Sequence, residues 1–546
     1  MKKDIMMKRS SFLTGTFITT TGIILSKVLG ALYVIPFHAI IGVKGGALYS
    51  YAYTIYASFL SLSTAGIPLA ISRIVAEYRA LGYQRAKKQA FVLGKRMSQG
   101  LGLFCFLLLF VFAPLLATAI LGGVVGGNTV KDVTLVIRVI ATAILFVPLL
   151  SVYRGFFEGH RMFGISSFSQ VLEQFIRVFI IVLGSFVFVR VFNVGITLCV
   201  VIALLGAPVG ALSAYVYLFL KKKKNDEKFH TSYRLINEPF ITNKIIMKKI
   251  ICYAVPFIFI DLFKSLYGYV DMLSLVKFLV KKASFSAQNA EMVYSIFSTW
   301  AQKFNMIILA ISSGVVVSLI PNLAELLAKK EQVEIQKKII QGLNVLLYLT
   351  IPLTFGISFL SKSIWNLFYG NSVYGPNILS YYIFVGLAAS FFSFILILLQ
   401  SLKEYKSLFI CLLIGLLLKI VLNNKLLFAF LQMRFPAYYG SITATIIGYF
   451  VPFIIGLIIL QKKYFLSFEG VIKNFIDVMC SAIIMVGIMF LIGLFLPTSA
   501  KVQIFNLFYI VMYTIIGAIV YFLGVEFSGV TKRVFGANLL FLLRKK

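Results

Sequence analysis

Charged residues inside long apolar stretches are the part of this sequence that is best suited to chemistry. Lys27 and Lys303 each lie well inside such a stretch, and neither has an acidic residue within one helical turn along the chain. A lysine at the centre of a bilayer costs about 2.5–3.5 kcal/mol on insertion scales, so it requires a partner or a wet cavity. Its ammonium group suits a phosphate or a pyrophosphate. We therefore expect Lys27 and Lys303 to bind an anionic ligand, and the alternative is a partner on another helix.

A second group of charges lies between residues 261 and 271. At 100° per residue, Asp261, Lys264 and Asp271 fall within about 80° of helical arc, so they share one face, which must look into protein or water. Two interpretations stay open. Either Asp261 neutralises Lys264, or these groups line a cavity in which Lys264 helps to bind the substrate. We further expect that transport either depends on the membrane potential or is coupled through Asp271.

Two further intramembrane cations have polar residues near them in the sequence. Glu173 precedes Arg177 by four residues, which is the favourable order for an ion pair on one helical face, so we expect a local structural pair. Lys419 is followed by Asn423 and Asn424. These amides are candidates to solvate its ammonium group.

Fourteen long apolar stretches must position these residues. Each offers about 20 or more mostly apolar residues, enough at about 1.5 Å per residue to cross a hydrocarbon core of roughly 30 Å. The stretches do not alternate as barrel strands do, so we predict an all-α polytopic membrane protein. The predicted spans are 11–38, 47–71, 98–121, 133–157, 165–189, 194–220, 250–276, 291–320, 339–361, 377–401, 407–428, 437–460, 474–496 and 502–525.

The distribution of Lys and Arg sets the orientation of these helices. With a cytoplasmic N-terminus, 36 of the 52 Lys and Arg residues lie in cytoplasmic segments and 10 in outside connections. This bias predicts that both termini are cytoplasmic. The formal charge of +34 then reflects topology and contact with anionic lipids, and no nucleic-acid partner is expected. All five cysteines fall in predicted spans and the three histidines are scattered, so we expect no disulfide framework, metal or cofactor.

An internal repeat organises the predicted helices. The motif Ala76-Glu77 at the end of the second span recurs as Ala324-Glu325 at the end of the eighth, and the intramembrane cations recur at a similar offset of roughly 240 residues. We therefore predict four parts: an N-lobe at 1–220, a basic cytoplasmic linker at 221–249, a C-lobe at 250–460, and two extra helices with a cytoplasmic tail at 461–546. Each lobe has six helices.

The connections between the spans argue against an enzyme. The outside loops are short and hold no catalytic arrangement of residues, and no GxxxxGK[ST] motif is present. Transport driven by a gradient, or facilitated exchange, is therefore expected. The predicted first span contains no Asp or Glu, which weighs against a cation or drug antiporter because such a transporter needs a buried carboxylate.

Several motifs resemble a known family of exporters. They are SKVLGALYVIPF (26–37), AGIPLAISRIVAEY (65–78), YRGFFEGHRMFGISSFSQVLEQFIRV (153–178) and QKFNMIILAISSGVVVSLIPNLAE (302–325). Over nearly the whole chain the sequence is similar to the MurJ/SpoVB branch of the MOP exporter superfamily, the polysaccharide biosynthesis type. The resemblance implies fourteen helices in two MATE-like lobes, a central cationic cavity and alternating access. It also implies export of lipid II, the undecaprenyl-pyrophosphate-linked peptidoglycan precursor.

The resemblance carries over to single residues. Lys27 and Lys303 match cationic positions of the family, and Asp271 matches its Gram-positive pattern. Tyr33 stands where Gram-negative members have a second arginine of the first helix, and their second-helix arginine has no equivalent among Ser58, Ser61 and Ser63. Lys264 either supplies the missing charge or is peculiar to this protein.

The function expected on this basis is that of a monomeric lipid II flippase in the cytoplasmic membrane of a bacterium. Its partners would be the undecaprenyl-linked substrate and anionic membrane lipids. The nearest alternative is an exporter of another lipid-linked precursor, for sporulation, teichoic acid or capsule. A multidrug antiporter and a membrane enzyme or scaffold are more distant alternatives.

Overall fold

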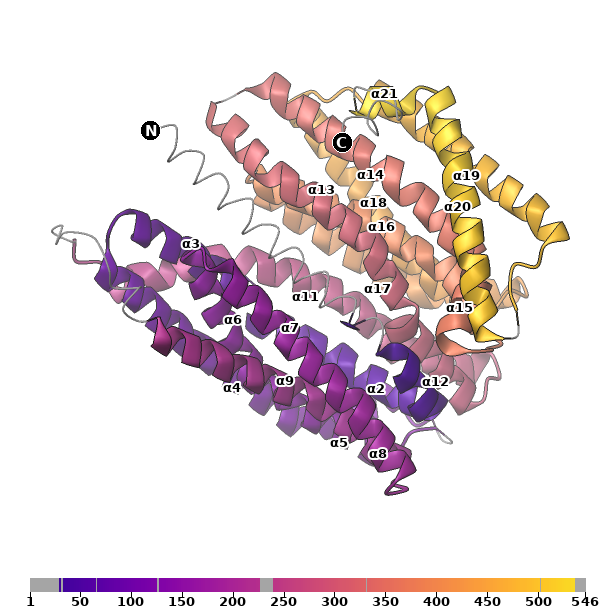
Figure 1. Ribbon diagram of the computed structural model, residues 1–546, viewed down its shortest axis with the longest axis horizontal. Coiled ribbons are helices and arrows are strands. Elements are labelled where there is room, and N and C mark those ends of the chain that lie inside the picture. Colours follow the sequence, from indigo (N-terminus) through magenta and orange to yellow (C-terminus); the bar gives the residue numbers. More distant parts are fainter. Residues whose placement is uncertain are drawn as a thin grey trace. The chain divides into compact units, whose positions relative to one another are not determined.

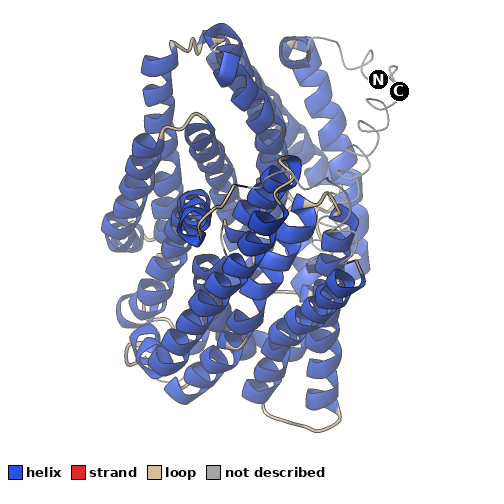
Figure 2. Cartoon of the chain, turned by 90° about the vertical axis from the view of Figure 1, so that its left-hand side faces the viewer, coloured by secondary structure: helices blue, strands red, loops and turns tan. Residues whose placement is uncertain are grey.

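The computed structural model is helical along nearly all of the chain that it describes (Figure 2). Eleven of its helical segments are long and apolar enough to cross a membrane, and they coincide with the predicted second to sixth and ninth to fourteenth spans. The all-α multi-pass class is therefore confirmed, whereas the total of fourteen spans stays a prediction. The described residues are 29–30, 33–64, 66–124, 127–225, 239–329, 331–500 and 502–535.

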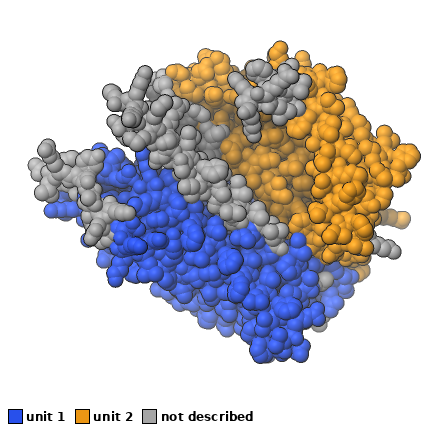
Figure 3. Space-filling model, in the orientation of Figure 1, with its two compact units in different colours: residues 1–277, 286–292 blue, residues 278–285, 293–546 orange. Residues whose placement is uncertain are grey.

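The chain packs as two compact units, which Figure 3 colours separately. Unit 1 comprises residues 1–277 and 286–292. Within it α3 packs on α6, α6 and α7 pack on α9, and α4 packs on α5 and α6 (Figure 1). Its helices are α2 (Val34–Thr64), α3 (Ile67–Ala80), α4 (Gln84–Leu121), α5 (Val130–Ala141), α6 (Ala143–Gly159), α7 (Phe163–Phe179), η1 (Ile180–Gly184), α8 (Ser185–Arg190), α9 (Ile196–Lys224), most of α11 (Asn243–Lys282) and the start of α12 (Ala287–Ser295).

Unit 2 comprises residues 278–285 and 293–546. Helix α16 packs on both α13 and α18, α18 packs on α17, and the C-terminal pair α19 and α20 lies along α14 and α15. The helices that begin in this unit are η2 (Ile296–Trp300), α13 (Gln302–Lys329), α14 (Gln332–Phe359), α15 (Ser361–Tyr369), α16 (Gly375–Ser401), α17 (Tyr405–Gln432), α18 (Tyr438–Tyr464), α19 (Glu469–Phe495), α20 (Gln503–Phe527) and α21 (Val530–Phe535).

Helix α11, which carries the predicted seventh span, groups with the helices that precede it in the chain. The boundary between the units falls at residue 277, whereas the sequence places the lobe boundary at the linker 221–249. The division of the chain into four parts, with the lobe boundary at 221–249, therefore stays a prediction. The predicted eighth span runs through α12, η2 and α13.

Two glycines interrupt the helical path at and just before the second predicted span. Gly42 has φ 60° and ψ −161° inside α2, so the expected connection between the first and second spans is a kink within one helix. Gly66 adopts φ 75° directly before α3, where Pro68 favours helix initiation. A Cβ atom at Gly66 would lie 2.6 Å from the carbonyl oxygen of Ala254 on α11. Only glycine therefore satisfies both the backbone angle and this close approach.

Two π-helical turns lie beside cations that the sequence singled out. The first, η1, begins three residues after Arg177, and the second, η2, ends three residues before Lys303. A π turn inserts one extra residue into a helix and so rotates the side chains that follow it, and such turns are frequent at functional sites.

Candidate functional site

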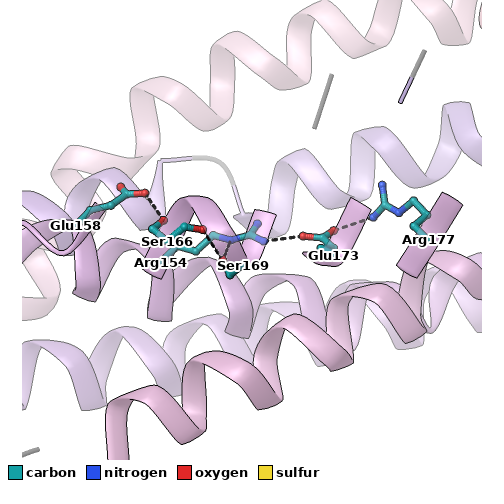
Figure 4. A network of polar contacts seen from close by, with 6 residues as sticks. All are labelled: Arg154, Glu158, Ser166, Ser169, Glu173 and Arg177. Carbon is teal, nitrogen blue, oxygen red and sulfur yellow. Dashed lines mark hydrogen bonds and ion pairs between the residues drawn. The ribbon is translucent and has the colours of Figure 1, made fainter. Parts of the chain in front are cut away.

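The hairpin of α6 and α7 carries a network of charged and hydroxyl side chains (Figure 4). Ser166 donates to Glu158 at 2.7 Å. Further from the turn, Arg154 donates to Ser169 at 2.9 Å and to Glu173 at 2.8 Å. These contacts are successive rungs between two antiparallel helices joined by a tight turn.

Glu173 is shared by two arginines. Its second oxygen accepts a hydrogen bond at 2.9 Å from Arg177, four residues later on the same helix. The side chains of Arg154, Glu173 and Arg177 are 15%, 12% and 16% exposed. One carboxylate is thus shared by two cations, and Glu158, which also interacts electrostatically with Arg154, brings the network to two cations and two carboxylates.

The sequence predicted a pair of Glu173 with Arg177 alone and did not link Arg154 to it. The spacing of these residues along the chain is the signal that links Arg154 to α7. Arg154 precedes His160 by 6 residues and Ser169 follows it by 9, so an antiparallel hairpin brings these two roughly level, and Glu173 lies one helical turn beyond Ser169 on the same face.

A row of tyrosines continues the polar interior of unit 1 from Arg177. The hydroxyl groups of Tyr33 and Tyr49 are 3.2 Å apart. The rings of Tyr49 and Tyr53 stack with centroids 5.6 Å apart, and those of Tyr53 and Tyr56 are 5.9 Å apart. The charge of Arg177 interacts with Tyr49, Tyr53 and Tyr56. Tyr33, which the resemblance placed at a cavity position, therefore lies at one end of a chain of phenols that leads to a buried arginine.

Helix α11 carries the other predicted charges of unit 1. Asp261 is exposed, whereas Lys264 and Asp271 are half-buried. Lys264 interacts electrostatically with Asp261, which is the contact expected if the two neutralise each other. This interaction does not test a role in transport, because a cavity lysine also needs a counter-charge when no anion is bound.

Helix α11 is held to the rest of unit 1 near both ends. Near its start, Lys249 contacts Glu77 of α3 at 2.6 Å, and Arg73 lies 4.5 Å from the ring centroid of Tyr253. Near its other end, the ammonium group of Lys277 donates at 2.6 Å to the carbonyl oxygen of Ala119. That oxygen belongs to the last turn of α4, where a cation is favoured by the helix dipole.

Lys303 lies on α13 in a neighbourhood of amides and tyrosines. Gln302 accepts a hydrogen bond from Tyr382 at 3.1 Å, and Asn305 donates to the carbonyl oxygen of Tyr382 at 3.3 Å. These bonds to α16 fix the rotation of α13 on both sides of Lys303, which is half-buried. Lys303 belongs to unit 2 and Lys264 to unit 1, and Lys27 lies outside the described residues.

Lys419 of α17 is completely buried. Asn423 accepts its hydrogen bond at 2.9 Å, as the sequence suggested. Two residues of α18, Ser441 and Thr445, add further oxygens. These hydroxyl residues carry no charge pattern that sequence analysis would have linked to a lysine 22 or more residues away.

Comparison with known proteins places this architecture in a family. The family model described as polysaccharide biosynthesis protein matches residues 12–327. The chain belongs to that family. One relative of this polysaccharide biosynthesis protein is the lipid II flippase MurJ of Bacillus subtilis (strain 168), with 31% identity over 476 residues, which are 85% of each chain. Another is stage V sporulation protein B of the same organism, with 28% identity over 214 residues, which are 39% of each chain.

Solved structures agree with the family at the level of the fold. A structure of the lipid II flippase MurJ in an inward closed conformation has a TM-score of 0.67 and 17% identity, and the match covers 95% of this chain and 100% of that one. An inward-facing multidrug resistance MATE transporter of the MOP superfamily has a TM-score of 0.63 and 13% identity, covering 80% and 94%. The chain therefore has the MurJ and MATE fold.

Proposed function

We propose that this protein is a flippase that exports lipid II across the cytoplasmic membrane of a bacterium by alternating access. The observation that carries the proposal is 31% identity to the B. subtilis lipid II flippase MurJ over 85% of the chain. The half-buried lysines Lys264 and Lys303 support an anionic substrate. A pyrophosphate linked to a lipid is such a substrate.

In this proposal Lys27, Lys264 and Lys303 supply positive charge for the pyrophosphate. A bound anion lowers the free-energy cost of a charged lysine in the membrane, and charge-assisted hydrogen bonds from the lysines bind the anion. Asp271 and Asp261 are proposed to balance these charges or to couple transport to an ion. Tyr33 would contribute a hydroxyl group at the end of the tyrosine row.

Export of another lipid-linked precursor is the second candidate. It is supported by the 28% identity to stage V sporulation protein B. The two candidates share a diphosphate-linked lipid but differ in the sugar, and the lysines would serve either substrate.

Complementation tests the proposal directly. The gene is expressed in a bacterium depleted of its only lipid II flippase, and growth is measured together with the amount of protein in the membrane. We expect growth to be restored by the protein and by a Lys425→Ala control, which changes an exposed lysine of α17. No growth despite normal membrane levels would reject lipid II and favour the second candidate.

A further inference from the structure

Lys419 presents the most completely enclosed charge among the described residues. Its side chain has 0% exposure. The ammonium nitrogen lies 2.7 Å from Thr445 Oγ1, 2.9 Å from Asn423 Oδ1, 3.1 Å from the Ser441 carbonyl oxygen and 3.3 Å from Ser441 Oγ. Its three N–H groups serve these four acceptors, so one proton is shared between two of them. These four oxygens come from two helices, α17 and α18, and none of them carries a formal charge.

The oxygens of Asn423, Ser441 and Thr445 form a cage around the ammonium group. Hydrogen bonds within this cage orient its oxygens toward a cation. Ser441 Oγ donates its proton to Asn423 Oδ1 at 2.9 Å. Thr445 Oγ1 donates its proton to the carbonyl oxygen of Ser441 at 3.0 Å. Because both hydroxyl protons are used in this way, both hydroxyl oxygens turn lone pairs toward the ammonium group. The cage is thus built to accept a positive charge and to reject a hydrogen-bond acceptor.

Carbonyl, amide and hydroxyl oxygens are also the ligands with which proteins replace the hydration shell of alkali cations. A buried ammonium group and a buried alkali cation have the same requirement, because each needs several oxygen atoms in place of the water that it has lost. In this protein the cation is attached to the chain, so it cannot exchange with the solution.

We propose that the cage of Asn423, Ser441 and Thr445 is a monovalent-cation site that the protein fills permanently with its own Lys419 ammonium group. The tethered charge fastens α17 to α18 and leaves the native protein indifferent to the cation in solution at this site. Removing the side chain should expose a site for Na⁺ or a small alkylammonium ion. This inference does not depend on the substrate that the protein exports.

The test compares Lys419→Ala with Lys419→Met. Alanine empties the cage, whereas methionine fills most of the same volume without a charge and leaves no room for an ion. The melting temperature of each purified variant is measured in detergent as NaCl or methylammonium chloride replaces N-methylglucamine chloride at constant ionic strength. For Lys419→Ala we expect a saturable rise of about 2 °C or more, because a ligand that binds only the folded state stabilises it. The native protein and Lys419→Met should show no such rise.

A folded Lys419→Ala protein that ignores both cations would overturn the proposal, and so would a native protein whose melting temperature depends on Na⁺. If Lys419→Ala does not fold, the cage is tested with Lys419 in place through Asn423→Leu and Thr445→Val. Each of these variants should lower the melting temperature by several degrees, because a buried ammonium group loses one acceptor. Unchanged melting temperatures in both would show that the oxygens do not hold the charge.

Discussion

Lys303, which we propose to bind the pyrophosphate, lies between residues whose positions are fixed by hydrogen bonds. Its neighbours Gln302 and Asn305 are bonded to Tyr382 of α16, so the helix cannot rotate around Lys303. Lys264 on α11 has Asp261 as an electrostatic partner. A lysine positioned in this way binds an anion at a smaller entropic cost than a lysine on a mobile segment.

Replacing Lys264 or Lys303 by alanine should lower export. Each change removes a charge-assisted contact to pyrophosphate of about 1.5–3 kcal/mol, which corresponds to roughly 10- to 150-fold. Arginine should retain part of the activity. The measurement is lipid II export at equal membrane levels, with Lys425→Ala as the exposed control. Full activity of both alanine variants would contradict a role of these lysines in substrate binding.

His160 makes the stability of the turn between α6 and α7 depend on pH. Burial, together with the nearby charges of Lys87, Arg79 and Lys222, lowers the pKa of His160 from 6.5 to about 4, although a hydrogen bond with the Phe156 carbonyl opposes the shift. The native state therefore holds its proton more weakly than the unfolded state does. Stability should fall as the pH drops from 6.5 towards 4.

The variant His160→Gln should lose this part of the pH dependence. The measurement is the difference in melting temperature between the native protein and the variant, from about pH 7.5 to about pH 4.5. We expect the melting temperature of the native protein, relative to that of the variant, to fall as the pH is lowered. A difference that stays constant over the whole range would contradict the assignment.

At the scale of elements, the hairpin of α6 and α7 is held by the rungs from Glu158 to Arg177. The rung at Glu173 matters most, because one carboxylate separates two arginines. The π turn η1 follows directly, so the hairpin is rigid up to Arg177 and changes its helical register after it. This arrangement keeps Arg177 facing the tyrosine row.

Replacing Glu173 by glutamine should destabilise the hairpin. Removing the charge from one member of a largely buried ion pair costs about 3 kcal/mol, because Arg154 and Arg177 then repel each other without a counter-charge. The matched control is Glu334→Gln on α14, where the pair with Lys337 is exposed and contributes less than about 1 kcal/mol. Thermal unfolding in detergent measures both. Equal losses in the two variants would show that the network does not stabilise the hairpin.

At the scale of the whole molecule, α11 belongs mainly to unit 1 but ends in unit 2. Its contacts with α3 and α4, through Lys249 and Lys277, attach its first 35 residues to the first unit. Substrate-driven transport requires two states whose populations a ligand shifts by its differential affinity. A helix shared between two units must adapt to any such change.

Single cysteines at His38 and Lys277 should report this change. Cys252 and Cys480 are exposed and are first replaced by serine. We expect the reactivity of the new cysteines toward an impermeant thiol reagent to change when the lipid-linked substrate is depleted. The same reactivity with and without substrate, in protein shown to transport, would contradict a mechanism gated by substrate.

The sequence by itself determined the helical class, eleven of the spans and the contact between Glu173 and Arg177. These features depend on hydropathy and on the helical period, which are local properties of the chain. Only the tertiary structure decided that the Arg154 side chain reaches Glu173, one turn beyond Ser169, because the reach of a side chain depends on how the two helices pack. It also decided that Ser441 and Thr445 complete the cage around Lys419. Neutral hydroxyl groups leave no charge pattern in a sequence, and they become ligands only when two helices bring their oxygens to the same point.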